Sequence, residues 1–414
     1  MKEHLSKRGQ TLVKDLSPLM QAHYNIQEDL YHPVNNPLGY INMGTAESHL
    51  VNDEILDLLH KIHGRLNLSP KHIHYDYFHG SLEFRTAIAE YWQKLIFPAD
   101  SARKLSPDHI VVGAGCSLAL EMLATMLGDP GDVVLVPAPY YSGFEDDFTH
   151  RAGIELVGVH CGSELDRSAF EEALVQQKAL GKRVCAVLFS SPNNPIGTVY
   201  SIAAIQELIS FCMDNNLDIV SDEIYAQTTH DPSAVWHSTL SLVPDEWLHK
   251  THVTSSFAKD FSLSGFRTGF AISFNEDLLK GMRGLAYYSC VSTHTQAVLV
   301  KLLQAPELPH ILQTCRRKLH AAWELIEENF RKMNIETLPA QGGIFVFANF
   351  APYMDQVIFS EEYTLWEKIY KELHISISPG QLFDADTPGW FRVCFAHDPA
   401  VVAEACARLK TLKH

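Results

Sequence analysis

Short, almost wholly apolar runs alternate with amphipathic stretches from about residue 81 onward. This alternation is typical of buried parallel strands joined by crossover helices. The amphipathic stretches 117–127, 167–180 and 201–215 are long enough for such helices. We therefore predict an α/β fold with a mostly parallel sheet covered by helices, whose strands add to the sheet in chain order. The predicted strands are His109–Val112, Val133–Val136, Val184–Phe189, Leu217–Val220 and His252–Ser255.

The pattern changes after about residue 295 and predicts a smaller α+β domain. A long helical stretch covers 296–333, and a second helical stretch lies near 361–373. Apolar runs at 342–348 and 390–395 predict strands. The first 50 residues contain turn-rich sequence and predict no sheet of their own. We therefore expect an N-terminal segment (1–50) that packs on the small domain or on a partner subunit, a large domain (51–294) and a small domain (295–414).

Composition narrows the class of protein. The 414 residues are 46% hydrophobic and 20% charged, which is typical of a folded, soluble chain. A net charge of −16 disfavours nucleic acid and anionic membranes as partners, so any anionic ligand needs a local pocket. No signal peptide or membrane-spanning run is apparent, and the eight cysteines form no C-x-x-C pair. We expect a cytoplasmic protein with buried thiols.

A lysine follows the last predicted strand of the large domain. Lys259 lies in the run Ser255–Gly269, and Arg267 follows it by eight residues. A lysine amine forms a Schiff base with an aldehyde when burial or a neighbouring cation lowers its pKa. A solvent-exposed loop lysine is the commoner case, so the neighbouring motifs decide between the two interpretations.

Two further motifs follow predicted strands, where open α/β sheets place their ligand groups. Asp222 could pair with a pyridinium nitrogen, and Tyr225 could hydrogen-bond a ring phenolate. Asn194 follows the preceding strand and could reach the same ligand. Taken alone, Asp222 also suits a helix N-cap, and the segment around Asn194 suits a turn.

A glycine turn provides an expected anion site. Gly113–Ser117 ends one strand and opens a helix, so its amides and the helix dipole favour an anion. Ser256 and Arg267 could complete a site for a phosphate monoester. Tyr141 offers a face on which a flat ring could stack, with core packing as the alternative.

Taken in order, these motifs resemble the fold-type I pyridoxal phosphate enzymes, in particular the branch of class I aminotransferases and aminocyclopropane-carboxylate synthases. The resemblance extends from about residue 35 to 410. It implies pyridoxal 5'-phosphate as cofactor, an L-α-amino acid as substrate, and a homodimer with shared active sites. No metal is expected.

The resemblance also implies roles for individual residues. Lys259 would be the Schiff-base lysine and proton carrier, Asp222 would hold the pyridine nitrogen, and Tyr141 would stack on the ring. Arg392, in Trp390–Phe395, would bind the substrate carboxylate. The implied catalytic residues are Lys259, Tyr141, Asp222 and Glu47. The implied cofactor-binding residues are Cys116, Ser117, Tyr141, Asn194, Asp222, Tyr225, Ser256, Lys259 and Arg267. The implied substrate-binding residues are Glu47, Asn194 and Arg392.

Two features bear on the reaction. Asn42–Ser48 resembles the synthase segment Gly-x-Ala-Glu-Asn, in which Glu47 would face the substrate; an exposed loop glutamate is the alternative. Phe78 stands where the family normally has a tyrosine that reaches the neighbouring subunit's phosphate. Tyr77 or Tyr75 could compensate, and the departure weakens the expectation of aminocyclopropane-carboxylate synthesis itself.

We therefore predict loss or replacement of a γ-substituent, or ring closure, by way of a carbanion. An aminotransferase is the alternative, and a non-catalytic cofactor-binding homologue is an alternative of another class. Among the 22 histidines, the close pairs His60/His63 and His72/His74 have no cysteine or acidic cluster beside them. His49 and His79 lie near predicted active-site segments and could shape the substrate pocket.

Overall fold

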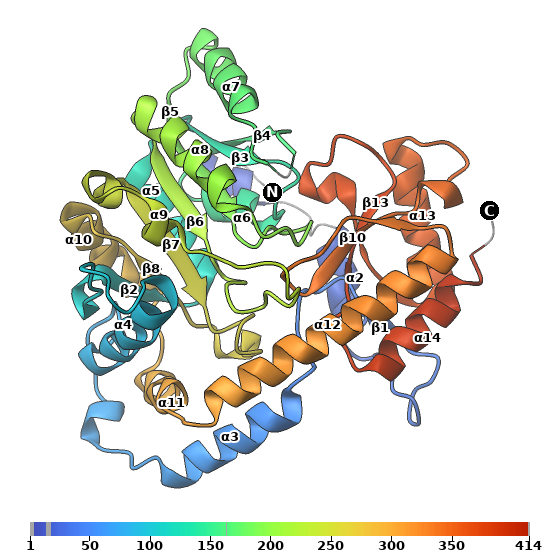
Figure 1. Ribbon diagram of the computed structural model, residues 1–414, viewed down its shortest axis with the longest axis horizontal. Helices are drawn as coiled ribbons and strands as arrows, with labels where there is room; N and C mark the ends of the chain where they lie inside the picture. The colour runs from blue at the N-terminus through green and yellow to red at the C-terminus, as the bar shows by residue number, and fades with distance from the viewer. Residues whose placement is uncertain (1–3, 14–17, 163, 413–414) are drawn as a thin grey trace.

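The computed structural model describes residues 4–13, 18–162 and 164–412, so part of the predicted N-terminal segment (1–3 and 14–17) lies outside the described residues. Its largest sheet has seven strands in the order β2-β8-β7-β6-β5-β3-β4 (Figure 1). These strands are β2 (Ile110–Gly113), β3 (Val133–Pro137), β4 (Glu155–Val159), β5 (Val184–Ser190), β6 (Asp218–Asp222), β7 (Thr251–Ser256) and β8 (Gly269–Ile272).

The strand directions bring six strand ends to one edge of this sheet. The strands β4, β3, β5, β6 and β7 run parallel to one another. The strand β8 is antiparallel to both β7 and β2, so β2 points the same way as β7. The carboxyl ends of these six strands therefore lie at the same edge, where open α/β sheets bind ligands.

The mostly parallel sheet is confirmed. The predicted strands β3, β5, β6 and β7 follow one another in chain order, but the prediction is wrong for β2, which lies at the edge opposite to β3 and β4. The sequence analysis also missed β4 and β8. Most residues of β4 are partly exposed at the sheet edge, and β8 is four residues long and begins at Gly269, so neither presents a clear apolar run between turns.

Helices cover both faces because the strand side chains alternate between them. In β3, Val134 and Val136 pack with Leu120 and Phe144, whereas Val133 and Leu135 pack in a separate cluster with residues of α7 and α8. The helices around this sheet are α4 (Leu82–Ile96), α5 (Cys116–Leu127), α6 (Gly143–Thr149), α7 (Arg167–Ala179), α8 (Ile202–Asp214), α9 (Thr239–Leu242), α10 (Glu276–Leu285) and α11 (Thr293–Leu303).

A second group of elements surrounds a four-stranded sheet of order β12-β13-β10-β9. Its strands are β9 (Glu336–Thr337), β10 (Phe345–Asn349), β12 (Ser378–Pro379) and β13 (Trp390–Cys394), and its helices are α12 (Leu308–Lys332), α13 (Phe359–Leu373) and α14 (Pro399–Leu409). The strand β1 (Ile41–Asn42) pairs in parallel with β11 (Ile375–Ser376). This pairing brings the beginning of the chain beside its end.

The remaining helices include one correction. The predicted helical stretch 296–333 divides into α11 and α12, and α12 has a proline in its first turn. Proline suits a helix start and not a helix interior, which explains the break. Before β1 lie α1 (Lys7–Leu12) and α2 (Pro18–Asn25), and α3 (Asn52–Arg65) follows it. The short 3₁₀ helices are Pro70–His72, Pro107–His109, Asp245–Lys250, Ser264–Phe266, Ala286–Tyr288, Ala351–Tyr353 and Gly380–Phe383.

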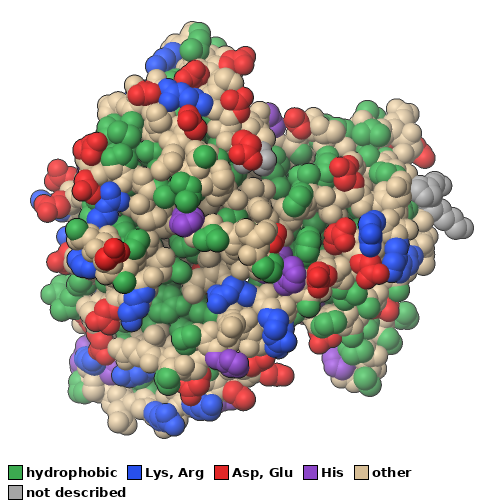
Figure 2. All heavy atoms as spheres, in the orientation of Figure 1, with side chains coloured by type: hydrophobic (Ala, Val, Ile, Leu, Met, Phe, Trp, Pro, Cys, Tyr) green, Lys and Arg blue, Asp and Glu red, His purple; other side chains and the backbone are tan. Residues whose placement is uncertain are grey.

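Surface charge is mixed on the face shown in Figure 2, where acidic and basic side chains are interspersed. This face therefore presents no extended region of one sign that would attract a polyanion. Within the described residues, no helix combines the length and the apolar character needed to cross a membrane.

Candidate active site

A cavity of about 560 Å³ lies at the edge where the six strands of common direction end. The residues that position it belong to strand ends or to the turns directly after them, because the parallel strands converge there. Every residue predicted to bind the cofactor lines this cavity, and so does the predicted carboxylate ligand Arg392. These lining residues are Cys116, Ser117, Tyr141, Asn194, Asp222, Tyr225, Ser256, Lys259, Arg267 and Arg392.

The amine of Lys259 lies just beyond the end of β7. Its Nζ donates a hydrogen bond to the backbone oxygen of Ala46. Burial, and to a lesser extent the nearby guanidinium of Arg392, lower the pKa of Lys259 to about 8, while Glu47 opposes the shift. A neutral amine is the nucleophilic form, so the site makes this lysine more reactive than a surface lysine.

The carboxylate of Asp222 is held at the end of β6. Its Oδ1 accepts hydrogen bonds from Cys116 Sγ at 3.4 Å and from Thr254 Oγ1 at 3.2 Å. Burial raises its pKa to about 6 even though these bonds favour the charged form. A buried carboxylate of this kind gains most from a cationic partner, and a protonated pyridine nitrogen is such a partner.

The glycine turn Gly113–Ser117 is packed tightly against Arg267 and β8. Gly115 has φ +96°, and a Cβ there would lie 2.7 Å from Nη2 of Arg267. A Cβ at Gly269 would lie 2.4 Å from the backbone nitrogen of Cys116. The turn therefore requires glycine at both positions, and the close approach aims the first amides of α5 and the Arg267 guanidinium into one region.

Asn194 and Arg392 hold one another across the cavity. Arg392 donates from Nη1 to Asn194 Oδ1 at 3.1 Å and from Nη2 to the backbone oxygen of Gly44 at 2.6 Å. Its guanidinium lies over the rings of Phe383 and Phe345, at 4.8 and 5.4 Å from their centroids. The buried Nε of Arg392 has no hydrogen-bond partner among the described residues. An arginine fixed in this way is prepared for an incoming carboxylate.

These groups fit pyridoxal phosphate. The cavity supplies an amine of lowered pKa, a buried carboxylate for a ring nitrogen, and a guanidinium beside a helix start for a phosphate. Tyr225 is buried edge-on against Phe345, with 5.2 Å between ring centroids, and Tyr141 packs on Phe144 in the same manner. Burial raises the pKa of both tyrosines, so each remains a hydroxyl that can donate a hydrogen bond.

Glu47 lies close to this group, but it does not line the cavity. Its Oε1 accepts a hydrogen bond from Ser264 Oγ, and its backbone oxygen accepts one from Cys394 Sγ at 3.4 Å. The predicted contact between Glu47 and a substrate therefore stays a prediction.

Other residues singled out in the sequence lie elsewhere. His49 stacks on His397, with ring centroids 4.8 Å apart, and is not part of the cavity wall. His79 is also outside the wall, and burial lowers its pKa to about 4. Phe78 packs edge-on against Tyr287. Across the described part of the chain, no group of three or more His, Cys, Asp or Glu side chains could hold a metal ion.

Several wall residues were missed by the sequence analysis. Ser264 lies inside the lysine motif and could have been found there. Asp147 is a buried carboxylate on α6 whose pKa is raised to about 8 by burial, and it follows the acidic residues Glu145 and Asp146, so the sequence does not distinguish it from a surface carboxylate. Thr45 lies inside the segment Asn42–Ser48, of which only Glu47 was singled out, whereas Met20 and His23 come from a part of the N-terminal segment where no pattern pointed to the cavity.

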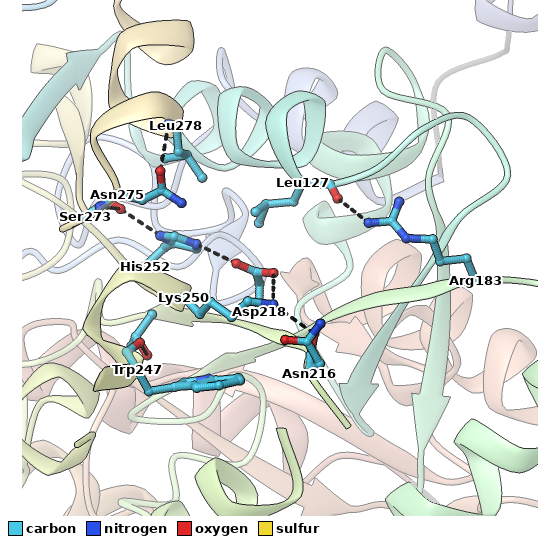
Figure 3. A network of polar contacts seen from close by, with 11 residues as sticks. Leu127, Arg183, Asn216, Asp218, Trp247, Lys250, His252, Ser273, Asn275 and Leu278 are labelled. Atoms are coloured by element: carbon cyan, nitrogen blue, oxygen red, sulfur yellow. Dashed lines mark hydrogen bonds and ion pairs between the residues drawn. The ribbon is translucent and has the colours of Figure 1, made fainter. Parts of the chain in front are cut away.

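A second polar network resembles a catalytic arrangement but is closed to substrate. In Figure 3, His252 lies between Ser273 and Asp218, with its Nδ1 2.9 Å from Ser273 Oγ and its Nε2 3.2 Å from Asp218 Oδ1. Lys250 pairs with the same aspartate. The side chains of His252 and Ser273 are fully buried, so the network ties β6, β7 and β8 together. Nothing could reach Ser273 as a nucleophile.

Comparison with known proteins identifies relatives over nearly the whole chain. The chain is 31% identical over 399 residues to 1-aminocyclopropane-1-carboxylate synthase 7 of Arabidopsis thaliana, covering 92% of this chain and 88% of that protein. It is 31% identical over 414 residues to 1-aminocyclopropane-1-carboxylate synthase 2 of Solanum lycopersicum, covering 95% and 84%.

Solved structures share the fold. An aspartate aminotransferase double mutant of Thermus thermophilus superposes with a TM-score of 0.78 at 21% identity, covering 99% of both chains. A Pyrococcus protein superposes with a TM-score of 0.80, also at 21% identity and covering 97% of both chains. The fold-type I architecture predicted from the sequence is thereby confirmed.

The family assignment follows from a match along most of the sequence. The family model described as aminotransferase class I and II matches residues 47–409. Enzymes of this family use pyridoxal 5'-phosphate, in agreement with the groups that line the cavity. This chain belongs to the aminotransferase class I and II family of pyridoxal phosphate-dependent enzymes.

Proposed function

We propose that this chain removes the α-proton of an L-α-amino acid with Lys259 and then promotes loss or replacement of a γ-substituent, with or without ring closure. The observation that carries the proposal is the convergence of Lys259, Asp222 and Arg392 on one cavity. The similarity to 1-aminocyclopropane-1-carboxylate synthases over more than 90% of the chain supports γ-chemistry in particular.

Each side chain has a role that follows from its position in the cavity. Arg392 binds the substrate carboxylate as a fork, which orients the α-carbon toward the amine. Lys259 holds the cofactor before the substrate arrives and afterwards acts as the base, because its lowered pKa makes the neutral form available near pH 8. When bound, pyridoxal phosphate supplies a ring that stabilises negative charge at the substrate α-carbon. Asp222 keeps the ring nitrogen protonated.

Glu47 is the proposed second acid or base. It lies near Lys259, and its carboxylate is held by Ser264. Release from Ser264 would let Glu47 carry a proton to or from the β- or γ-carbon region of the substrate. A Glu47→Gln variant should therefore keep α-proton exchange and lose the later steps.

The test uses borohydride and product analysis. Reduction of the cofactor-loaded protein followed by digestion should place the adduct on Lys259, with Lys259→Ala as the control that gives none. Amino acids are then screened for α-deuterium exchange and for their products. Loss of a γ-substituent supports the proposal. An adduct at another residue would contradict it.

Aminotransfer is the second candidate, and the match to the aminotransferase class I and II family model and the likeness to an aspartate aminotransferase structure support it. Phe78 lacks the hydroxyl that the family normally has at this position, which weakens the expectation of aminocyclopropane-carboxylate synthesis itself, and its ring packs on Tyr287. In the case of aminotransfer, Lys259 would return the proton to a carbon of the cofactor and not to the substrate. Stoichiometric formation of a 2-oxo acid and pyridoxamine phosphate would establish aminotransfer and exclude γ-chemistry as the main reaction.

We infer further that the three predicted segments are an N-terminal segment (1–50), a large domain (51–294) and a small domain (295–414). The pairing of β1 with β11 supports assigning the N-terminal segment to the small domain. In Figure 1, α12 extends from the region of the large sheet to the second sheet. Limited proteolysis should cut first near these boundaries.

Two copies are proposed to pair through an exposed aromatic surface, defined here as Ile73, Tyr75, Tyr77, Tyr287 and Tyr288. Tyr75 is 95% exposed, Tyr288 76% and Ile73 74%, although large apolar side chains favour burial. The surface borders a second cavity of about 600 Å³. In a dimer, the hydroxyl of Tyr75 or Tyr77 could reach the partner's phosphate in place of the hydroxyl that Phe78 lacks.

Light scattering tests the dimer. The purified protein should have twice the 46.5 kDa mass of one chain. A Tyr75→Ser, Tyr288→Ser double variant should shift toward the mass of a single chain at micromolar concentration. Leu180→Ser is a matched control, because Leu180 is 68% exposed and lies outside the aromatic surface. A fully active monomer would contradict the shared active site.

A further inference from the structure

The N-terminal helix α2 forms one wall of the cavity. Met20 and His23 on this helix line the cavity together with Thr45. The helix is held in place by buried side chains, because Ala22 is 2% exposed and Ile26, just after the helix, is fully buried. Figure 1 shows α2 behind β10, beside the second sheet. The N-terminal segment therefore contributes to the active site and does more than pack on the small domain.

A chain of polar side chains on this wall ends at the hydroxyl of Thr45. The side-chain oxygen of Asn42 accepts hydrogen bonds from the backbone nitrogens of Gly44 at 3.3 Å and Thr45 at 3.1 Å. These backbone donors fix the orientation of the amide. Its Nδ2 therefore faces Thr45 and donates to Oγ1 at 3.0 Å.

The same hydroxyl contacts His23, whose Nδ1 lies 2.9 Å from Thr45 Oγ1. The side-chain nitrogen of Gln27 donates to the backbone oxygen of His23 at 3.1 Å and lies 3.3 Å from its Nε2 and 3.4 Å from its Nδ1, so this contact fits either tautomer. In the tautomer with the proton on Nδ1, the imidazole donates to Thr45. Asn42 and His23 then occupy both lone pairs of the Thr45 oxygen, and its own proton is available for a group in the cavity.

The position of Thr45 relates this proton to the substrate. Its neighbour Gly44 accepts a bond from Arg392, and its neighbour Ala46 accepts one from Lys259. The proposed sites of the substrate carboxylate and of the α-carbon thus lie on either side of Thr45. The wall formed by Met20, His23 and Thr45 remains for the side chain, and it contains no lysine or arginine. A neutral acceptor suits it better than a carboxylate does.

We propose that His23 carries its proton on Nδ1 and that Thr45, oriented by His23 and Asn42, is a specificity-determining residue that donates a hydrogen bond to a neutral oxygen acceptor on the substrate's γ-substituent, such as an ester or amide carbonyl. This inference rests on the proposed function and narrows it to a substrate class. A wall with a committed donor rejects a side chain that lacks an acceptor, because the donor is then left without a partner.

The experiment compares equilibrium binding of three amino acids, followed through the absorbance of the bound cofactor. O-acetyl-L-homoserine and L-glutamine carry a neutral carbonyl, and L-norleucine has similar length without one. Thr45→Val should weaken binding of both carbonyl probes about tenfold and leave L-norleucine unchanged. Thr45→Ser should retain tight binding. His23→Phe should reproduce part of the Thr45→Val loss, because it removes the donor that directs the hydroxyl.

The controls separate this inference from the proposed function. Gln21→Ala alters the exposed face of the same helix and should bind all three probes as the unmodified protein does. If Thr45→Val weakens the binding of all three amino acids equally, the hydroxyl binds the substrate carboxylate and the inference is overturned. The inference is also overturned if Thr45→Val weakens the binding of none of them. If the unmodified protein exchanges the α-proton of no amino acid, the proposed function itself fails.

Discussion

At the scale of single residues, the site places two cations close together in a water-poor cavity. Burial is the larger cause of the lowered pKa of Lys259, and Arg392 adds to it because two nearby positive charges repel. Arg392 is stabilised by Asn194 and by the backbone of Gly44 and remains charged. Lys259 is the group that gives up its proton.

Replacing Arg392 with glutamine should raise the pKa of Lys259. The neutral fraction of the amine at pH 7.5 then falls, and capture of pyridoxal phosphate by the cofactor-free protein should slow by roughly threefold to tenfold. The measurement is the rate of absorbance change on adding the cofactor, taken as a function of pH. Arg167→Gln serves as control, because Arg167 pairs with Glu171 and Asp214 outside the cavity. An unshifted pH profile for Arg392→Gln would contradict the coupling.

At the scale of elements, the conformation of the glycine turn Gly113–Ser117 depends on how closely β8 approaches the start of α5. Gly269 lies at the beginning of β8, opposite Gly113 in the register of β2. A side chain there would collide with backbone atoms of Gly115 and Cys116, which cannot move without displacing the helix start. The strand pairing and the anion site are therefore one structural unit.

Gly269→Ala should damage both stability and cofactor binding. Overpacking of this kind costs about 1–3 kcal/mol, and displacement of the α5 amides should weaken pyridoxal phosphate binding at least about tenfold. Urea unfolding and a cofactor titration measure the two effects. Gly265→Ala is the matched control in the same loop, because a Cβ there would meet no atom within 4 Å. Equal behaviour of the two variants would show that the close approach is not required.

At the scale of the whole molecule, buried histidines lie where the two groups of elements meet. His230 is 6% exposed, its backbone nitrogen donates to the oxygen of Gln341 at 3.0 Å, and its ring packs edge-on against Phe395. Burial lowers the pKa of His230, and likewise of His397, to about 4. Neither ring nitrogen of His230 has a hydrogen-bond partner among the described residues.

The stability that these two histidines contribute should therefore fall as the pH falls from about 6.5 toward 4, while Asp147 and Asp222, whose pKa values are raised by burial, act in the opposite direction. In this range the unfolded chain binds protons at these histidines and the folded chain does not, which costs about 1.4 kcal/mol per pH unit for each histidine. Urea unfolding at pH 7, 6 and 5 measures the slope. His230→Phe should reduce it by the share of one histidine, whereas His60→Gln, on the exposed face of α3, should not. Parallel slopes for all three proteins would contradict this assignment.

The sequence itself determined the class of fold and the set of residues around the cavity. The spacing of apolar residues along the chain predicts the strands and crossover helices. Asp222, Asn194 and Lys259 lie at the ends of strands or shortly after them. Parallel strands end at one edge, so short motifs that follow them must meet. Local pattern could not give the strand order, because the pairing of β3 between β5 and β4 depends on contacts between distant segments.

Only the tertiary structure decided which other groups face the cavity. The pairing of β1 with β11 brings Asn42 and Thr45 to the site, and α2 follows because Ala22 and Ile26 are buried. The same packing turns the carboxylate of Glu47 toward Ser264. None of these contacts has a fixed spacing along the chain. They arise from the burial of apolar surface between segments far apart in sequence, a force that acts without direction and leaves no local motif.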